Sequence, residues 1–324
     1  MSEPGYPNTF GVPADPRISH PEIFDPALKQ HYRAFRRGEP VFDDPRPAER
    51  WRGVRRRAME RAAAAVAGSP WGSSLVLRGS LLLKVWLGEP AREPGDLDWV
   101  VVPPTVSVGD AAARGMPAGL PALIAAQPAE GFEWLAAQAA WDDIWTYERA
   151  PGRRLVLPWR SPGLPPGFVQ MDFVFGEELW DHAVRTPMTD GAGGTATPWT
   201  ATPEQSLAWK IQWLESDQYP QGKDLYDAVL LAEHCRLSPA LLERALEAGG
   251  RGGDRAAKAD FPMDWRVDWE EFRREYPWVV GEAPDWQARL VRALEPTFRT
   301  PQLPSAPGGG LTGEEPMLPA AGGR

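Results

Sequence analysis

Two aspartates, Asp96 and Asp98, interrupt an otherwise apolar stretch, residues 95–102, that is typical of a β-strand. Side chains alternate between the faces of a strand, so both carboxylates lie on one face, while Leu97 and Trp99 lie on the other. Adjacent carboxylates repel each other, and both stay ionised only beside a cation or strong hydrogen-bond donors. Mg²⁺ is usually held by one or two carboxylates together with substrate phosphates. The pair is therefore either a metal site or a strand end that faces water.

A third carboxylate, Asp172, lies in a later stretch whose apolar residues alternate as in a half-buried strand. The alternating residues, which we expect to form the buried face, are Val169, Met171, Phe173 and Phe175. Asp172 then projects from the opposite face. If the two strands are neighbours, the nearest oxygens of the three aspartates should lie roughly 3–6 Å apart, within reach of one metal site. Two ions held about 3.5–4 Å apart by such acids can clamp the attacking and leaving oxygens of a phosphoryl transfer.

Gly79 and Ser80 form a turn between a predicted strand, residues 74–77, and a predicted helix, residues 81–87. The start of a helix presents free backbone N–H groups and the positive end of the helix dipole, which together bind anions. Glycine lets the backbone approach a phosphate closely, and the Ser80 hydroxyl can add a donor. A Gly-Ser turn alone is common, but its position just before the Asp-x-Asp strand makes it a candidate triphosphate site.

The chain becomes helical at Thr202, where a hydroxyl cap, Pro203 and Gln205 mark a helix start. Lys210 lies at the edge of the apolar stripe of this helix, which consists of Leu207, Ile211 and Leu214. We expect this stripe to pack on the preceding α/β half. Lys210 then either faces a buried anion, such as a triphosphate, or is a surface lysine whose stem covers apolar area.

Lys223, Asp224 and Asp227 belong to the start of the next predicted helix, residues 224–235. Both acids flank the apolar stripe of that helix by the i, i+3, i+4 rule. Acids in a first turn are favoured by the helix dipole. Alternatively, one of them pairs with Lys210 or lies near an acceptor hydroxyl, because a buried ammonium needs a partner when no nucleotide is bound.

The order of the predicted elements gives an α/β (α+β) fold class, with an α/β half followed by an α half. Further helices are expected over residues 21–67, 120–127 and 130–148, a strand over 153–157, and a flexible loop over 190–197. We expect four segments: an N-terminal leader and helical extension at 1–70, a catalytic core at 71–198, a helical domain at 199–300, and a disordered tail at 301–324.

Charge and composition limit the possible partners. The net charge of −9 argues against broad nucleic-acid binding, which depends on phosphate neutralisation, but it allows a local basic patch. One predicted helix contains Arg50, Arg52, Arg55, Arg56, Arg57 and Arg61, which form either a solvated face or a phosphate-facing patch. The single cysteine fits a reducing cytoplasm. We expect neither a membrane span, since no apolar run approaches roughly 20 residues, nor a signal peptide in the polar N-terminus.

These motifs together resemble the AbiEii/AbiGii nucleotidyltransferase toxin family, which belongs to the polymerase-beta-like nucleotidyltransferase superfamily. The resemblance extends from about Leu75 to Glu233. The matching stretches are residues 77–80, 92–98, 170–177, 203–210 and 223–227. Their order and approximate spacing agree with the family, although Lys223 stands where the family often has arginine.

The resemblance implies a polymerase-beta-like core with a small mixed sheet flanked by helices, followed by a helical C-terminal half. It implies Mg²⁺ binding by Asp96 and Asp98, triphosphate binding by Gly79 and Ser80, and a nucleotide contact from Lys210. Asp227 matches the late acid of the family, either as a base or as structural support. Members transfer nucleotides to RNA or protein acceptors, and a separate antitoxin neutralises the toxin.

The expected function is therefore Mg²⁺-dependent transfer of an NMP from an NTP to tRNA or protein, with Asp172 completing a two-ion site. One alternative is an antibiotic nucleotidyltransferase, since the acidic balance suits a cationic acceptor such as an aminoglycoside. Another is a non-catalytic module of the same fold that binds a nucleotide or a partner. Arginines of residues 50–61 beside the active site would favour tRNA over an aminoglycoside.

Overall fold

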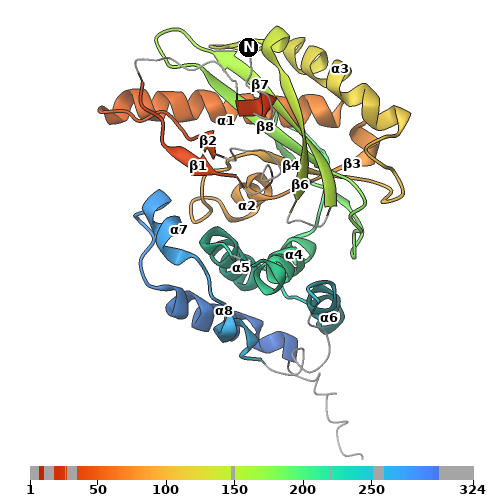
Figure 1. Ribbon diagram of the computed structural model, residues 1–324, viewed down its shortest axis with the longest axis vertical. Helices are drawn as coiled ribbons and strands as arrows, with labels where there is room; N and C mark the ends of the chain where they lie inside the picture. Colours follow the sequence, from red (N-terminus) through yellow and green to blue (C-terminus); the bar gives the residue numbers. More distant parts are fainter. Residues whose placement is uncertain are drawn as a thin grey trace, which may run out of the picture.

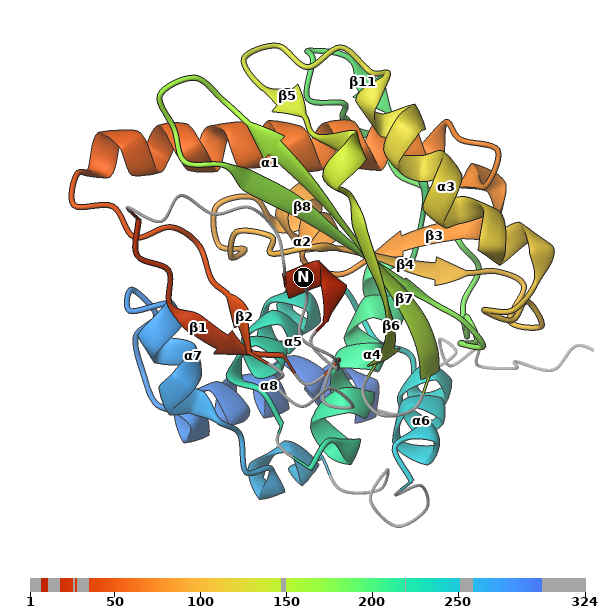
Figure 2. The same ribbon diagram turned by 45° about the horizontal axis from the view of Figure 1, so that its top comes forward.

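The computed structural model describes residues 7–10, 18–25, 27, 35–146, 150–218, 220–250 and 259–298. In these ranges the chain forms an α/β half built on a mixed sheet and a helical half that lies against it (Figure 1). Figure 2 shows helices α1 (Pro45–Ala67) and α3 (Ala111–Ala125) on the side of the sheet away from the helical half. This arrangement confirms the α/β class with a helical second half.

The main sheet has eight strands within the described ranges, in the order β5-β7-β8-β4-β3-β12-β9, with β6 paired to β7. Its strands are β3 (Leu75–Arg78), β4 (Leu97–Val101), β5 (Glu133–Trp134), β6 (Ala140–Thr146), β7 (Ala150–Arg160), β8 (Gly167–Val174), β9 (Val184–Arg185) and β12 (Trp199–Thr200). Strand β4 pairs in parallel with β8 and antiparallel with β3, and β7 pairs antiparallel with β8. Strand β4, which contains Asp98, and strand β8, which contains Asp172, are therefore neighbours in the centre of the sheet.

The two faces of the sheet have different partners. One face packs on α1 and α3 through a continuous core that includes Trp99 and Phe173. The opposite face packs on α4 (Pro203–Ser216) through Trp209 and Trp213. Asp98 is one position away from Trp99, so its side chain lies on the α4 face. The strand alternation thus separates the charged side chains from the larger core.

The helical half has a core of its own between α4, α5 and the helices that follow. These helices are α5 (Gly222–His234), α6 (Pro239–Ala248), α7 (Trp269–Glu275) and α8 (Ala283–Phe298). Helix α4 begins as predicted, because the Thr202 hydroxyl accepts a hydrogen bond from the Gln205 amide at 3.1 Å. Leu83 of α2 (Ser80–Leu87) and Ala91 join this core. The helix that follows the Gly79 turn is therefore anchored to the helical half.

Two helices expected from the sequence are wrong in part or in full. In the described part of residues 21–44, β1 (Glu22–Phe24) pairs with β2 (Phe35–Arg37), and α1 begins only at Pro45. Gly38 and Pro40 interrupt the helical pattern between the end of β2 and the start of α1. Residues 130–146 form β5, a 3₁₀ turn and β6 instead of a helix. Strand β6 pairs antiparallel with β7, the next strand along the chain, over its whole length, and this pairing outweighs the helix preference of the residues.

Smaller differences concern the ends of elements. Helix α3 begins at Ala111, earlier than expected, and contains two prolines. Residues 190–197 belong mostly to a hairpin between β10 (Met188–Thr189) and β11 (Thr195–Ala196), whose turn is closed by hydrogen bonds to the Asp190 carboxylate. The expected tail, residues 301–324, and most of residues 1–20 lie outside the described residues. In the part of the chain that is described, no helix has the length and apolar character of a membrane span.

Candidate active site

Four charged side chains form a row across the sheet. The register pairs Arg78 of β3 with Asp98 of β4, Asp98 with Asp172 of β8, and Asp172 with Arg154 of β7. Neighbouring strands lie about 4.7–4.9 Å apart, so each aspartate has the other on one side and an arginine on the other. Asp96 directly precedes β4 rather than belonging to it. The row brings together two acids that are 74 positions apart along the sequence.

The carboxylates of Asp96, Asp98 and Asp172 converge on one point. One oxygen from each lies within 4.8 Å of the others, which matches the spacing that the strand patterns predict. Asp172 is buried, whereas Asp96 and Asp98 are partly exposed, so a ligand can approach the cluster from one side. Oxygen ligands at this spacing suit a hard divalent cation.

The electrostatics of the cluster also fit a cation. Burial of the carboxylate, together with the charge of Asp96, raises the pKa of Asp98 to about 7. Burial also raises the pKa of Asp172, against the opposing influence of Arg154. Both carboxylates are thus held in an environment that disfavours their charged form, and a bound cation reverses that preference. These three residues are able to hold a metal ion.

Arg154 ties Asp172 to the N-terminal segment. Its Nε and Nη2 each donate to one Asp172 oxygen at 2.8 Å, which is a bidentate pair. Its third nitrogen, Nη1, donates to the buried carboxylate of Asp25. Burial lowers the pKa of Arg154, but the charges of Asp172 and Asp25 outweigh it and the pKa is raised. Asp25 therefore acts on the cluster through Arg154.

Gln170 adds a polar group beside the carboxylates. Its side-chain amide lies 3.5 Å from an Asp96 oxygen and 3.4 Å from an Asp172 oxygen. The orientation with the amide oxygen toward Arg154 gives hydrogen bonds of 3.1 and 3.3 Å, and it is the better one because the guanidinium is a donor only. In that orientation a fourth oxygen faces the space between the aspartates.

The Gly79–Ser80 turn lies directly against Asp98. Gly79 has φ +86°, and a Cβ added there would lie 2.5 Å from Asp98 Oδ2. Only glycine fits this position, because the left-handed backbone and the close carboxylate both exclude a side chain. The Ser80 hydroxyl is buried and has no hydrogen-bond partner among the described residues. The turn therefore offers an unused donor next to the cluster, as a triphosphate site requires.

Lys210 lies at the centre of a buried ion network in the helical half. Its ammonium contacts Asp224 at 2.7 Å and Asp227 at 3.0 Å, and Asp227 also accepts from Arg92 at 2.9 Å. Burial lowers the pKa of Lys210, but the charges of both aspartates outweigh this effect, so the pKa is raised above its ordinary value. The two acids thus lie where a buried ammonium needs them, as the sequence predicts. The positive charge of Lys210 acts on Asp98 and lowers its pKa.

The expected packing of the Leu207, Ile211 and Leu214 stripe is wrong. These residues belong to the core of the helical half, to which the described part of the α/β half contributes Leu83 and Ala91 as buried residues and a few partly buried ones. The sheet is contacted instead by Trp209 and Trp213. Helix α4 is buried on nearly all sides, so apolar periodicity does not identify the face that meets the sheet.

Other residues were misjudged or missed by sequence reasoning. Lys223 is partly exposed, and no contact among the described residues joins it to the carboxylates. Arg154 lies in a predicted strand, but its position opposite Asp172 depends on the β7–β8 register. Arg92 begins the family-like stretch 92–98, but no local pattern indicates its pairing with Asp227, which is 135 residues away. Asp25 precedes every motif and carries no sequence signal.

A comparison with known families identifies the family to which this chain belongs. A family model described as nucleotidyl transferase AbiEii toxin, type IV TA system, matches residues 61–292. The chain belongs to the AbiEii family. It is thus a nucleotidyltransferase of a family of type IV toxins. The AbiEii match covers the three aspartates, the Gly79–Ser80 turn and Lys210, but not the segment that supplies Asp25. No curated protein matches the sequence.

Proposed function

We propose that this AbiEii chain uses Mg²⁺ to transfer an NMP from an NTP to an RNA acceptor, preferably tRNA. The observation that carries the proposal is the convergence of three carboxylate oxygens within 4.8 Å, directly beside the Gly79–Ser80 turn. Asp96, Asp98 and Asp172 would hold the metal, and Gly79 with Ser80 would hold the triphosphate. When bound, Mg²⁺ neutralises the triphosphate and the charge that develops during transfer.

The residues of the site bind and orient the two reactants. In the proposed reaction an acceptor hydroxyl oxygen forms a bond to the α-phosphorus of the NTP. The bond to the β-phosphate oxygen breaks, pyrophosphate leaves, and the hydroxyl proton passes to solvent at the open side of the cluster. Lys210 is proposed to orient the triphosphate, because its ammonium lies 5.1 Å from the Trp213 ring that also contacts Arg78, the neighbour of Asp98.

Asp227 is proposed to support the site rather than to act as a base. Its carboxylate is fully buried, and both oxygens accept hydrogen bonds from Arg92. Burial raises the pKa of Asp227, but Arg92 and Lys210 outweigh it and the pKa is lowered. A carboxylate with a lowered pKa and occupied oxygens is a poor proton acceptor near neutral pH. Asp227, with Asp224, would instead hold Lys210 in place.

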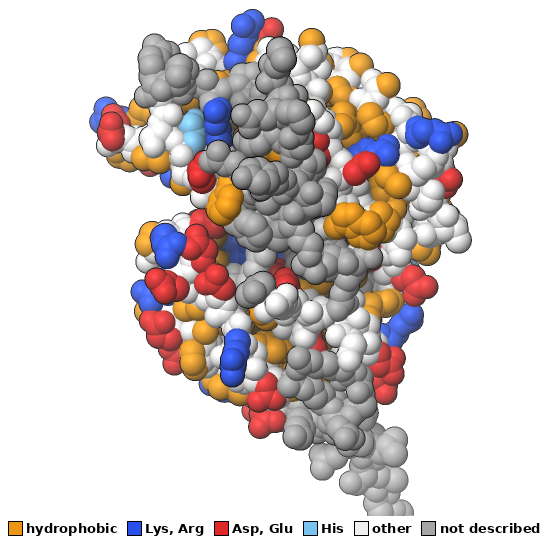
Figure 3. All heavy atoms as spheres, in the orientation of Figure 1, with side chains coloured by type: hydrophobic (Ala, Val, Ile, Leu, Met, Phe, Trp, Pro, Cys, Tyr) orange, Lys and Arg blue, Asp and Glu red, His pale blue; other side chains and the backbone are white. Residues whose placement is uncertain are grey.

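The position of the arginine helix favours RNA over a cationic acceptor. Arg55 donates to the Gly95 carbonyl at 2.7 Å, next to Asp96, and Arg56 pairs with Glu93 at 2.7 Å. Arg52 lies one turn earlier on the same side of α1. On the described part of the face in Figure 3, acidic and basic side chains are interspersed. Arg55 and Arg56 are paired with Glu39 and Glu93 in the free chain, and a phosphate backbone would be able to replace these glutamates beside the carboxylates.

The test is incubation of the purified chain with each α-labelled NTP and Mg²⁺, in the presence of total tRNA, protein or aminoglycosides. We expect Mg²⁺-dependent labelling of tRNA by the parent chain and none by Asp98→Asn, which removes a metal ligand but little volume. Asp143→Asn is the matched control, because Asp143 is an exposed aspartate of β6 in the same sheet, and its partner is Arg153 of β7 rather than the cluster. Labelled aminoglycoside would establish the antibiotic alternative. NTP binding without transfer to any acceptor would establish a binding module.

A further inference from the structure

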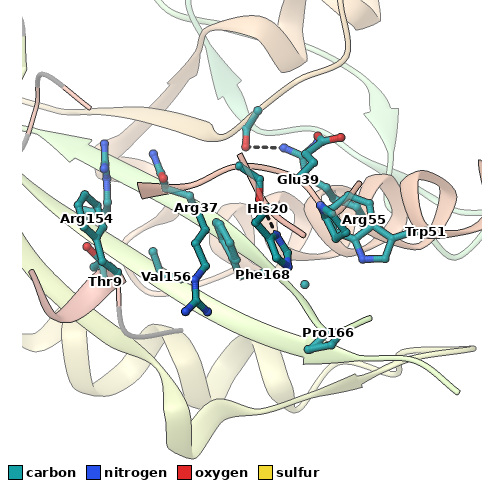
Figure 4. A pocket seen from close by; sticks show the side chains of 16 residues that line it. Thr9, His20, Arg37, Glu39, Trp51, Arg55, Arg154, Val156, Pro166 and Phe168 are labelled. Carbon is teal, nitrogen blue, oxygen red and sulfur yellow. Dashed lines mark hydrogen bonds and ion pairs between the residues drawn. The ribbon is translucent and has the colours of Figure 1, made fainter. Parts of the chain in front are cut away.

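A pocket adjoins the carboxylates on the side away from the Gly79–Ser80 turn. Its walls come from the N-terminal segment before α1, from α1 itself, and from strands β7 and β8 (Figure 4). Gly95 and Gln170 line it and also border the cluster, Gly95 by preceding Asp96 and Gln170 by its contacts with two aspartates. A ligand in the pocket is thus next to the reacting groups.

Two pocket residues have unused hydrogen-bonding capacity. Arg37 of β2 is exposed and has no ion-pair or hydrogen-bond partner among the described residues. The Nδ1 of His20 donates to the Gly38 carbonyl at 3.0 Å, while its Nε2 is buried without a partner in the part of the chain that is described. An unpaired buried polar atom costs free energy, so His20 Nε2 indicates a polar ligand. Arg37 is exposed, and it adds a positive charge at the pocket that no acid among the described residues neutralises.

An apolar ring lies beside these polar groups. Phe168 of β8 is partly exposed in the pocket lining, near Arg37 and His20 (Figure 4). Arg55 is fixed at one end of the pocket by Glu39 at 2.5 Å and by the Gly95 carbonyl. An aromatic face beside guanidinium groups is the arrangement with which proteins bind an unstacked base and its phosphate.

The position of the pocket determines which reactant enters it. In a phosphoryl transfer the attacking and leaving oxygens are roughly in line with the phosphorus. If the leaving pyrophosphate lies at the Gly79–Ser80 turn, at the β3 end of the charged row, the acceptor must approach from the β8 and β7 end. The pocket lies at that end, against Arg154 and Gln170. This step rests on the proposed function.

We propose that this pocket binds the terminal nucleotide of a single-stranded RNA end and presents its hydroxyl to the cluster. The base stacks on Phe168, a phosphate pairs with Arg37, and His20 Nε2 hydrogen-bonds the base edge or the ribose. The pocket residues before position 61 lie outside the range that the family model matches. The N-terminal segment thus supplies acceptor specificity to a shared catalytic core.

The proposal is tested with the full chain, by measuring transfer to tRNA and binding of a fluorescent single-stranded RNA by the inactive Asp98→Asn variant. Arg37→Ala and His20→Ala should each raise the acceptor KM and the RNA Kd by roughly tenfold and leave the NTP KM unchanged. Arg37→Ala should also lower the slope of log Kd against log salt by about 1, since one phosphate contact is lost. The matched control is Arg160→Ala, because Arg160 is an exposed β7 arginine paired with Glu133 outside the pocket.

The outcomes separate this inference from the proposed function. If the parent chain transfers nucleotides to RNA, and both pocket variants retain its acceptor KM and RNA Kd, the acceptor binds elsewhere and the pocket assignment is overturned. Transfer to protein but not to RNA also overturns it, although the catalytic assignment stands. If the parent chain transfers to no acceptor, the proposed function itself fails. Equal losses in the Arg37 and Arg160 variants indicate a general charge effect and likewise overturn the pocket assignment.

Discussion

Replacing Asp227 by asparagine tests whether this residue supports the site or takes part in the chemistry. Its carboxylate is fully buried and contacts Arg92 and Lys210 at 2.9 and 3.0 Å. With asparagine at this position, Lys210 keeps the carboxylate of Asp224, whereas Arg92 loses the one carboxylate that pairs with it among the described residues. Removing one member of a buried ion pair typically costs about 3–5 kcal/mol. We therefore expect the free energy of unfolding at pH 7 to fall by about that amount, a large part of the stability of an ordinary domain.

The pH dependence of this loss follows from the direction of the pKa shift. The pKa of Asp227 in the folded chain is lowered from its ordinary value of 3.8. Its stabilisation is therefore present above about pH 4 and is lost as the pH falls through the lower folded-state pKa. The difference in unfolding free energy between parent and variant should shrink in acid.

Urea unfolding between pH 3 and 8, followed by tryptophan fluorescence, measures both effects. Asp143→Asn provides the matched control, because it removes an exposed ion pair with Arg153 and should cost only about 0–1 kcal/mol. The reasoning is refuted if Asp227→Asn unfolds like the parent at every pH. If that stable variant also loses transfer, Asp227 is a base and not a support.

Three further predictions concern the cluster. Asp98→Asn should stabilise the metal-free chain increasingly between about pH 4 and 7, because the raised pKa of Asp98, about 7, makes its ionisation destabilising as the pH rises. Thermal unfolding without Mg²⁺ measures this, and addition of Mg²⁺ should raise the Tm of the parent only. Gly79→Ala should reduce transfer at least roughly tenfold and cost about 1–3 kcal/mol of stability, because its Cβ would lie 2.5 Å from Asp98 Oδ2; unchanged transfer rates would contradict this. Asp25→Asn should weaken Mn²⁺ binding, because Arg154 then competes more strongly for Asp172 and one negative charge is lost. Asp25→Glu should restore the Mn²⁺ affinity. Calorimetry measures this affinity, and an unaltered value in Asp25→Asn would exclude an effect of Asp25 on the metal site.

The sequence predicts those parts of the site that depend on a local pattern within a single strand or turn. Asp98 and Asp172 each break an apolar alternation on a single face, so the strand period alone places them opposite the core. The Gly79 turn is similar, because glycine and a following helix are local signals. Their convergence needs only that β4 and β8 be adjacent, and the parallel β4–β8 pairing of this sheet provides it.

The remaining parts depend on contacts that no local period encodes. Residues 130–146 contain alanines and acids that favour a helix, yet β6 forms because β7 offers a partner along its whole length. Arg154 faces Asp172 only through the β7–β8 register, and a shift of one residue would place Arg153 there instead.

The N-terminal segment shows the same limit most clearly. Asp25 is separated by 129 residues from its partner Arg154. The backbone amide of Thr9 donates to the Asp142 carboxylate at 2.7 Å, across 133 residues. No pattern within residues 1–44 indicates either contact: residues 1–20 have the composition of a loose leader, and residues 21–44 have an apparent helical character. The family match therefore identifies the class of reaction, while the contacts of the N-terminal segment, to which we assign the acceptor side, are visible only in the folded chain.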